Sequence, residues 1–359
     1  MENQGHRHEM TGRSEAAHGS RPGATESPAS AQDNSESHGG AQGSADSHGR
    51  PLVSESLLLL ASAIWGFAFV AQRVAMDHIG PFTFNAVRFA LGSLPMLPLI
   101  ALARRPVRER QSNVSSAVRP VGSAGQTARP PLRWVLLSGL AAGALLYGGA
   151  SLQQFGIVYT TAGKAGFITG LYVIIVPIMG LLWKIRPGAT AWVGAALGIV
   201  GLFLLSVTEQ LTMGLGDSLV LAGAFFWAGH VIIVGWLTKR IDVGTLAFLQ
   251  FATCAVLSFL TALAVEDIRL DGIVAAAGPI LYGGFISVGI AYTLQLVGQR
   301  RTPPSHAAII LGLEAVFAAV GGWAVLNETL SNRALIGCAL MLAGVIVSQF
   351  RPRRTAIPG

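Results

Sequence analysis

Residues 302–330 read TPPSHAAIILGLEAVFAAVGGWAVLNETL. Between His306 and Leu326 almost every side chain is apolar or small, and a helix of about 20 such residues crosses a bilayer. The run carries one acid, Glu314, which a rise of about 1.5 Å per residue places about 12 Å along the helix. Because a charge near mid-bilayer costs on the order of 3 kcal/mol or more, we expect Glu314 to face protein, water or a ligand.

A second stretch, residues 160–171, echoes the first. Aligning TTAGKAGFITGL with TPPSHAAIILGL places Lys164 opposite His306, and Tyr172 opposite Glu314. Identical residues occur at Thr160/Thr302, Ala165/Ala307, Ile168/Ile310, Gly170/Gly312 and Leu171/Leu313. The preceding spans also align, with Gln153 on Gln295 at the same offset of about 142, and Trp65 on Trp227 at about 162. The chain therefore contains an internal repeat.

Composition assigns the chain to the membrane class. Of its 359 residues 52% are hydrophobic and only 12% are charged, about half the charged fraction of a soluble domain. The net charge of +7 does not indicate a nucleic-acid partner, because the arginines cluster in short loops between apolar spans. Cys254 and Cys338 both lie inside apolar spans and belong to no metal-binding motif. We expect no cofactor and no metal.

Residues 1–50 contain no Leu, Ile, Val, Phe, Tyr or Trp, and we expect a disordered tail. The segment has no apolar core of a secretory signal. Its histidines allow either weak metal binding or a plain solvated tail; they are His6, His8, His18, His38 and His48.

Ten apolar spans follow, and Asp217 is expected to cap the sixth. They cover about 57–76, 82–103, 134–155, 163–183, 190–207, 218–237, 243–264, 277–298, 306–326 and 333–350. We expect Pro95 and Pro98 to bend the second. The sequence predicts an all-α integral membrane protein whose ten transmembrane helices form two five-helix inverted repeats, residues 51–208 and 209–350. An odd number of spans in each repeat makes the two repeats insert with opposite orientation.

Lysine and arginine mark one side of the membrane. They fill the loop 104–133, the later loops on the same side and the tail 351–359, whereas the opposite loops are mainly acidic. The positive-inside rule places both termini in the cytoplasm of a multi-pass protein, and we expect the plasma membrane.

The stretches WGFAFVAQRVAMDHIGPFTFNAVRF, YTTAGKAGFITGLYVIIVP and ILGLEAVFAAVGGWAVLNETL resemble the EamA-type carriers of the drug/metabolite transporter superfamily. The resemblance covers about residues 57–350 and implies a carrier, often an exporter, that moves small solutes by alternating access. Many relatives have proline after the acid of the ninth span, where this chain has Ala315. Family substrates include amino acids, metabolites and cationic drugs.

Glu314 is the first candidate for the substrate site. It either meets a cationic group of the solute or carries a coupling proton; the alternative is a structural acid held by hydrogen bonds between helices. Arg88 either contacts an anionic group of the substrate or pairs with a carboxylate for structure. His230 either binds substrate or is a core histidine. The aromatic candidates Tyr172, Trp65 and Trp227 could stack on a cation or simply pack.

Lys164 and His306 begin the fourth and ninth spans, on opposite membrane sides, and are candidates for gating or coupling. The alternative is that each extends to the interface. Gly194 and Gly198 in the fifth span, like Gly337 and Gly344 in the tenth, indicate close helix contacts, either between these spans or with a second copy in a homodimer.

The leading hypothesis is thus a secondary transporter of a small-molecule solute, exporting amino acids, related metabolites or cationic compounds. A membrane-embedded enzyme is the second class, although the spans contain no HExxH, GxSxG or P-loop motif. A channel is the third, although no filter-like loop is present. No catalytic residue is assigned.

Overall fold

A computed structural model describes residues 45–103, 130–160, 162–206, 213–326 and 331–350, and these residues form helices without a strand. The tail up to residue 44, the segments 104–129 and 351–359, and Glu328 lie outside them. In chain order the helices are α1 (Ala45–Ala75), α2 (Pro81–Ser93), α3 (Met96–Ala103), α4 (Leu132–Tyr159), α5 (Ala162–Gly170), α6 (Tyr172–Leu182), α7 (Ala189–Ser206), α8 (Leu215–Leu237), α9 (Val243–Val265), α10 (Leu270–Ala275), α11 (Ala277–Leu281), the π-helix η1 (Tyr282–Tyr292), α12 (Thr293–Gln299), α13 (Pro304–Leu311), α14 (Glu314–Leu326) and α15 (Asn332–Gln349).

The predicted spans are confirmed. Nine helical segments of the described chain are long and apolar enough to cross a membrane, and Ala189–Leu205 is a shorter apolar helix at the place of the fifth span. The second span is interrupted between α2 and α3, where Pro95 stands. Two boundaries differ from the expectation. α1 begins at Ala45, inside the segment predicted to be disordered, and α4 begins at Leu132, inside the predicted basic loop.

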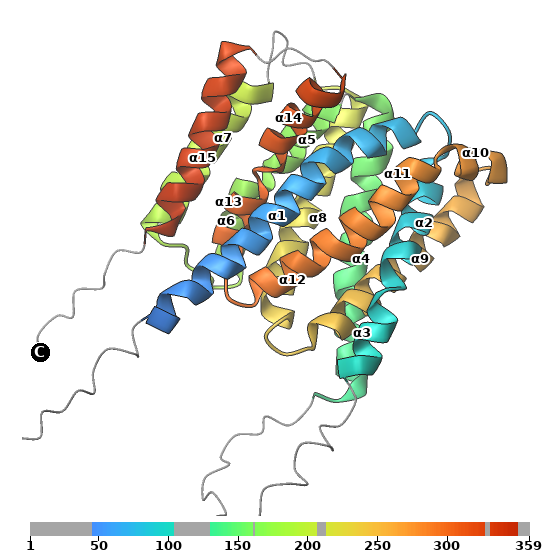
Figure 1. Ribbon diagram of the computed structural model, residues 1–359, viewed down its shortest axis with the longest axis horizontal. Coiled ribbons are helices and arrows are strands. Elements are labelled where there is room, and N and C mark those ends of the chain that lie inside the picture. The colour runs from blue at the N-terminus through green and yellow to red at the C-terminus, as the bar shows by residue number, and fades with distance from the viewer. Residues whose placement is uncertain (1–44, 104–129, 161, 207–212, 327–330, 351–359) are drawn as a thin grey trace, which may run out of the picture. The chain divides into compact units, whose positions relative to one another are not determined.

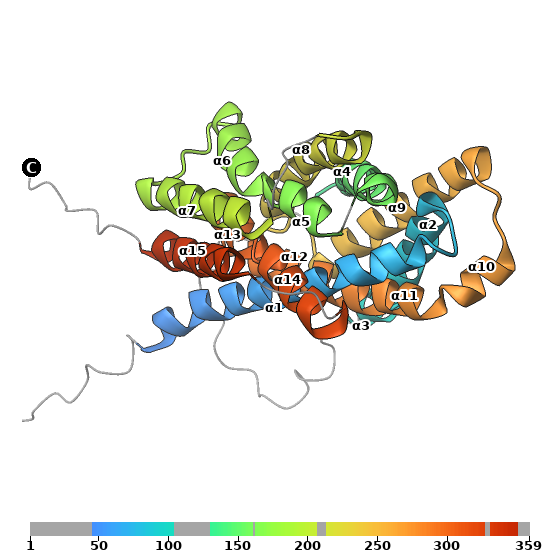
Figure 2. The same cartoon turned by 90° about the horizontal axis from the view of Figure 1, so that it is seen from above.

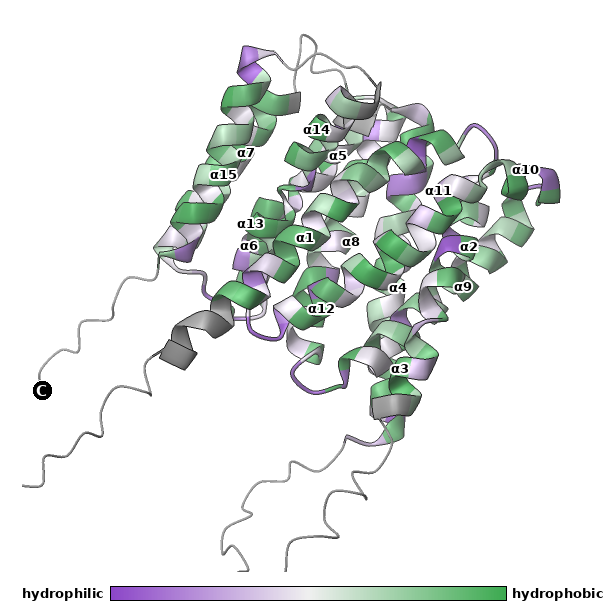
Figure 3. Ribbon diagram, in the orientation of Figure 1, coloured by the Kyte–Doolittle hydropathy of each residue, from purple (hydrophilic) through white to green (hydrophobic). Residues whose placement is uncertain are grey.

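The helices consist mainly of hydrophobic residues (Figure 3), and many large apolar side chains are exposed. Leu137, Leu182 and Trp183 are each more than half exposed. A soluble protein would not expose so many large apolar side chains together, whereas lipid covers them at no cost. The chain is an integral membrane protein.

The helix contacts repeat under exchange of the two halves (Figure 1). The third span, α4, packs on α8 and α9 of the second half. Its counterpart in the repeat, the eighth span with η1 and α12, packs on α1 and α2 of the first half. The fourth span, α5 and α6, packs on α8, while the ninth, α13 and α14, packs on α1. α2 pairs with α9, and α7 with α15. The set of contacts maps onto itself, as expected for two five-helix inverted repeats.

The fourth and ninth spans are both interrupted, and at equivalent positions. α5 ends at Gly170 and α6 starts at Tyr172, while α13 ends at Leu311 and α14 starts at Glu314. Each interruption is a single tight turn, in which the amides of Leu171 and Leu313 bond to the carbonyl three residues earlier. The ninth span is thus interrupted although alanine, Ala315, and not proline follows Glu314.

α7 and α15 lie side by side in both views (Figures 1 and 2). A Cβ added to Gly194 would lie 2.7 Å from the Gly344 carbonyl oxygen, and Gly201 and Gly337 approach one another as closely. The predicted glycine contacts therefore join the fifth and tenth spans of the same chain.

Gly194→Val should lower the stability of the protein by about 1–3 kcal/mol, because the added side chain would meet the α15 backbone. Thermal unfolding in detergent measures the effect. Gly166→Ala is the control, since nothing lies within 4 Å of a Cβ at that position. Equal unfolding temperatures for Gly194→Val and the parent protein would contradict the close α7–α15 contact.

Candidate functional site

The two interrupted spans bring Tyr172 and Glu314 into the interior, each as the first residue of its half-helix. Gly66 of α1 passes so close to α14 that an added Cβ would lie 2.7 Å from the Glu314 carbonyl oxygen. α1 therefore fixes the start of α14. A carboxylate at a helix N-terminus also gains about 0.3–1 kcal/mol from the helix dipole.

A narrow cavity of about 40 Å³ lies at this point. Its walls come from both repeats: Trp65, Phe69, Gln72, Arg88, Gln153, Thr169, Tyr172, Trp227, Val231, Ser287, Tyr292, Gln295, Leu311 and Glu314. Such a space holds a few water molecules, whereas sites for small organic ligands are typically about 300–1,000 Å³. A ligand of that size would fit this cavity only if the helices moved apart.

Glu314 is only 4% exposed. The Tyr172 hydroxyl interacts with its carboxyl group, whereas Glu314 Oε1 is buried without a hydrogen-bond partner among the described residues. Tyr172 and Glu314 are the equivalent positions found in the sequence repeat, so the two repeats meet each other here. Glu314 is also one of the residues that line the cavity.

Gln153 organises the polar wall of the cavity. Its Nε2 donates to Gln72 Oε1 at 3.1 Å, and its Oε1 accepts from Trp227 Nε1 at 3.0 Å and from Thr169 Oγ1 at 3.3 Å. The equivalent Gln295 has no such network, and its buried Oε1 is without a partner among the described residues. One wall of the cavity is thus polar and hydrogen-bonded, and the wall related to it by the repeat is not.

Arg88 is buried in the second span. Its Nε donates to Asn85 Oδ1 at 3.0 Å, and its guanidinium lies 5.0 Å from the ring centres of Phe84 and Phe89. No ion pair joins it to a carboxylate in the described part of the chain. Of the two roles expected for Arg88, structural pairing with a carboxylate is not observed among the described residues, and contact with an anionic group of the substrate stays a prediction.

Tyr292 is the centre of the aromatic side of the cavity. Its ring centre lies 4.6 Å from that of Trp65 and 6.2 Å from that of Trp227. His230 does not line the cavity; it packs edge-on against Tyr292 and Trp227, and its Nε2 lies 3.0 Å from Gln250 Oε1. His230 thus lies against two rings that line the cavity, and a role in substrate binding stays a prediction.

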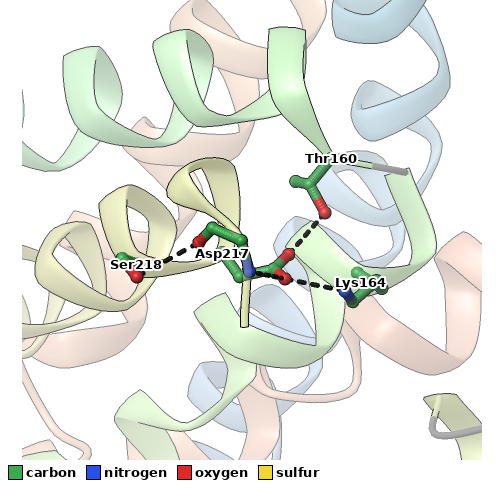
Figure 4. Close-up of polar contacts among 5 residues, drawn as sticks. Thr160, Lys164, Asp217 and Ser218 are labelled. Carbon is green, nitrogen blue, oxygen red and sulfur yellow. Dashed lines mark hydrogen bonds and ion pairs between the residues drawn. The ribbon is translucent and has the colours of Figure 1, made fainter. Parts of the chain in front are cut away.

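Lys164 is held by an acid at the start of the sixth span (Figure 4). Its Nζ donates to Asp217 Oδ2 at 2.7 Å, and Thr160 Oγ1 donates to Asp217 Oδ1 at 2.6 Å. Asp217 is not the N-cap that the sequence predicts; Gly214 is, and its amide donates to Asp217 Oδ2 at 3.0 Å. We call Thr160, Lys164 and Asp217 the first latch, because they join the end of α4, the start of α5 and the start of α8.

His306 lies in the first turn of α13, half-buried, at the opposite end of the bundle from Lys164. Neither candidate for gating touches the cavity wall. Within the described ranges, no three His, Cys, Asp or Glu side chains gather as a metal site would require. The tail histidines fall outside those ranges.

The sequence did not single out Tyr292, Gln72, Thr169 or Ser287. Tyr292 had one available signal, a hydroxyl-bearing ring three residues before the repeated glutamine Gln295. The other three are small or uncharged residues in apolar spans, and only the packing of α1, α5 and η1 brings them to the cavity.

Comparison with known proteins identifies the family. The EamA-like transporter family matches residues 52–207 and again residues 214–350. The chain belongs to this family. Each match covers one five-span half, so the EamA-like unit occurs twice, in agreement with the repeat.

Two relatives of this EamA-like chain are similar over most of its length. An "Uncharacterized transporter" of Archaeoglobus fulgidus is 29% identical over 296 residues, covering 82% of this chain and 85% of the relative. A "Probable amino-acid metabolite efflux pump" of Salmonella typhimurium is 26% identical over 329 residues, with 84% and 96% covered. A solved crystal structure shares the fold at a TM-score of 0.63 and 18% identity, covering 84% of this chain and 99% of that one.

Gln153→Met should destabilise the protein by about 1–3 kcal/mol, because it removes the acceptor of Trp227 Nε1 and the donor to Gln72 Oε1. Gln295→Met is a matched control from the equivalent position, where fewer hydrogen bonds are lost, and its effect should be smaller. Thermal unfolding of both variants in detergent provides the comparison. An equal decrease in unfolding temperature for Gln153→Met and Gln295→Met would contradict the assignment of the hydrogen-bond network to the Gln153 wall.

Proposed function

We propose that the protein is a secondary transporter that moves a small metabolite through the central cavity by alternating access, with export as its direction. The observation that supports this proposal is the convergence of Arg88, Glu314 and the aromatic rings on one cavity between two inverted repeats. Inverted-repeat carriers bind their substrates near mid-membrane, at the repeat interface and beside interrupted helices.

The substrate class follows from the two charged groups. Arg88 offers a cation, and Glu314 offers a carboxyl oxygen that has no hydrogen-bond partner among the residues that the structure describes. Trp65, Tyr292 and Trp227 line the same cavity. A solute with both an acidic and a basic group would satisfy both residues, and aromatic faces favour a cationic group. Amino acids and related metabolites therefore fit best, and organic cations fit the Glu314 side alone. The name of the Salmonella relative agrees with this class.

Coupling to a proton would use the same carboxyl group. Glu314 exchanges its proton for the basic group of the solute in this proposal, so one site serves both. Lys164 and His306 lie near opposite ends of the bundle and act as gates rather than as contacts to the solute.

Glu314→Gln should abolish or strongly weaken ligand stabilisation while leaving the fold intact, because it removes the charge but keeps the shape. A thermal-shift screen measures how far each ligand raises the unfolding temperature of the purified protein and of this variant. The ligands are amino acids, organic cations and sugar derivatives. Asp77→Asn is the control, since Asp77 belongs to an exposed ion pair with Arg73. A ligand that stabilises the parent and Glu314→Gln equally would place the site elsewhere.

The proposed location is the plasma membrane, with both termini in the cytoplasm. α1 begins and α15 ends at the same end of the bundle, where the Gln349 side chain meets Glu55. The described basic connections between α6 and α7, α8 and α9, and α12 and α13 fall at this end, which the positive-inside rule assigns to the cytoplasm.

Cysteine labelling in intact cells tests this orientation. A membrane-impermeant maleimide should modify Asp267→Cys, between α9 and α10, and not Lys239→Cys, between α8 and α9. Both positions are exposed, so accessibility of the side chain does not limit the reaction. The reverse labelling pattern would contradict the proposed orientation.

A further inference from the structure

The first latch has a counterpart at the other end of the bundle. The repeat offsets relate Thr160 to Thr302 and Lys164 to His306, and the offset of the sixth span relates Asp217 to Glu55. The order of residue types is kept: a threonine, a basic side chain four residues later, and an acid in the first turns of the span that packs beside them.

The backbone contacts beneath the two sets are also equivalent. A Cβ on Gly156 would lie 2.8 Å from the Gly216 carbonyl oxygen. A Cβ on Gly298 would lie 2.8 Å from the Ser54 carbonyl oxygen, and Ser54 is the repeat counterpart of Gly216. The pair of helices therefore crosses with the same close approach at both ends.

At each end, the close contact between the two helices lies next to the threonine and the acid. Gly156 is followed after four residues by Thr160, which bonds to Asp217, the residue after Gly216. Gly298 is followed after four residues by Thr302, which is buried, and Glu55 is the residue after Ser54. Glu55 is half-buried here, and the Gln349 amide nitrogen, when turned toward it, lies 3.2 Å from its Oε2.

We infer that Thr302, His306 and Glu55 form a second latch, which closes the opposite end of the cavity from the first. The inference rests on the proposed alternating access. A cavity of about 40 Å³ admits a metabolite only when one end opens. Opening the end near α5 separates Lys164 from Asp217, and opening the other end separates His306 and Thr302 from Glu55. Glu55 and Asp217 are then positioning residues for transport that never touch the solute.

The test uses a reporter cysteine in the cavity wall. Ser287→Cys is introduced into the full chain with Cys254 and Cys338 replaced by alanine, and a membrane-impermeant maleimide is applied to each face of membrane vesicles of known orientation. Asp217→Asn should increase labelling from the face near α5. Glu55→Gln should increase labelling from the opposite face. A change of about five-fold in each is expected, which corresponds to about 1 kcal/mol in a two-state equilibrium.

Two further pairs of variants complete the design. Thr160→Val should increase labelling from the face near α5, and Thr302→Val should increase labelling from the opposite face. These variants keep the test informative if an acid variant fails to fold. Ser218→Ala and Ser56→Ala are matched controls: these serines follow the latch acids, both are exposed, and Ser218 bonds only within its own turn.

The outcomes separate the latches from the transport proposal. Suppose that the parent labels from both faces. If Glu55→Gln and Thr302→Val then leave labelling unchanged, or raise it from the same face as Asp217→Asn does, the second latch is overturned while alternating access stays intact. A reporter that labels from neither face in any variant would contradict the cavity as the transport site, and with it the latches that close it.

Discussion

The contact between Tyr172 and Glu314 lies where two interrupted helices meet inside a protein that spans a membrane. In hydrocarbon every polar backbone group and every charge needs a partner within the protein. An interrupted span with a carboxyl group at its restart is therefore stable only in the interior, and the other helices have to enclose it. Gly66 on α1 allows the close approach that does so.

The two halves share a contact pattern but differ at the cavity. Gln72 and Thr169 of the polar network have Val234 and Leu311 at the equivalent positions. Arg88 has Gln250 as its counterpart, and Gln250 bonds to His230 and does not line the cavity. A symmetric frame thus carries an asymmetric cavity lining. In the proposed transport cycle the frame would supply two alternative openings, and the lining would give the solute one preferred orientation.

The sequence predicted the span order and the repeat, because each leaves a simple pattern. It also singled out the charged residues Arg88 and Glu314, which line the cavity together with the candidates Tyr172, Trp65 and Trp227. Long apolar runs separated by charged loops mark the helices, and a lone acid in such a run, Glu314, marks the interior. The sequence does not predict the interruptions at Leu171 and Leu313, because no proline stands there and a tight turn of ordinary residues resembles a helix in sequence.

The sequence also cannot show which aromatic rings line the cavity. Packing between helices places Tyr292 at the cavity wall and His230 against Tyr292, away from the wall. Asp217 resembles a helix cap in the sequence, because its partners Thr160 and Lys164 are distant in the chain and only the fold brings them together. The roles of all these residues in transport stay predictions.

The most direct test of the central claim, that the two repeats exchange openings around one cavity, is a pair of distances measured by pulsed electron paramagnetic resonance. Spin labels at Val74 and Leu215 report on one end of α1 and α8, and labels at Leu52 and Trp236 report on the other; all four side chains are exposed. Each pair is introduced as cysteines into a chain without Cys254 and Cys338. The account predicts two populations, in which one distance is long when the other is short, with a stabilising ligand shifting their ratio. Distances that stay fixed in every condition, or that lengthen together at both ends, would contradict it.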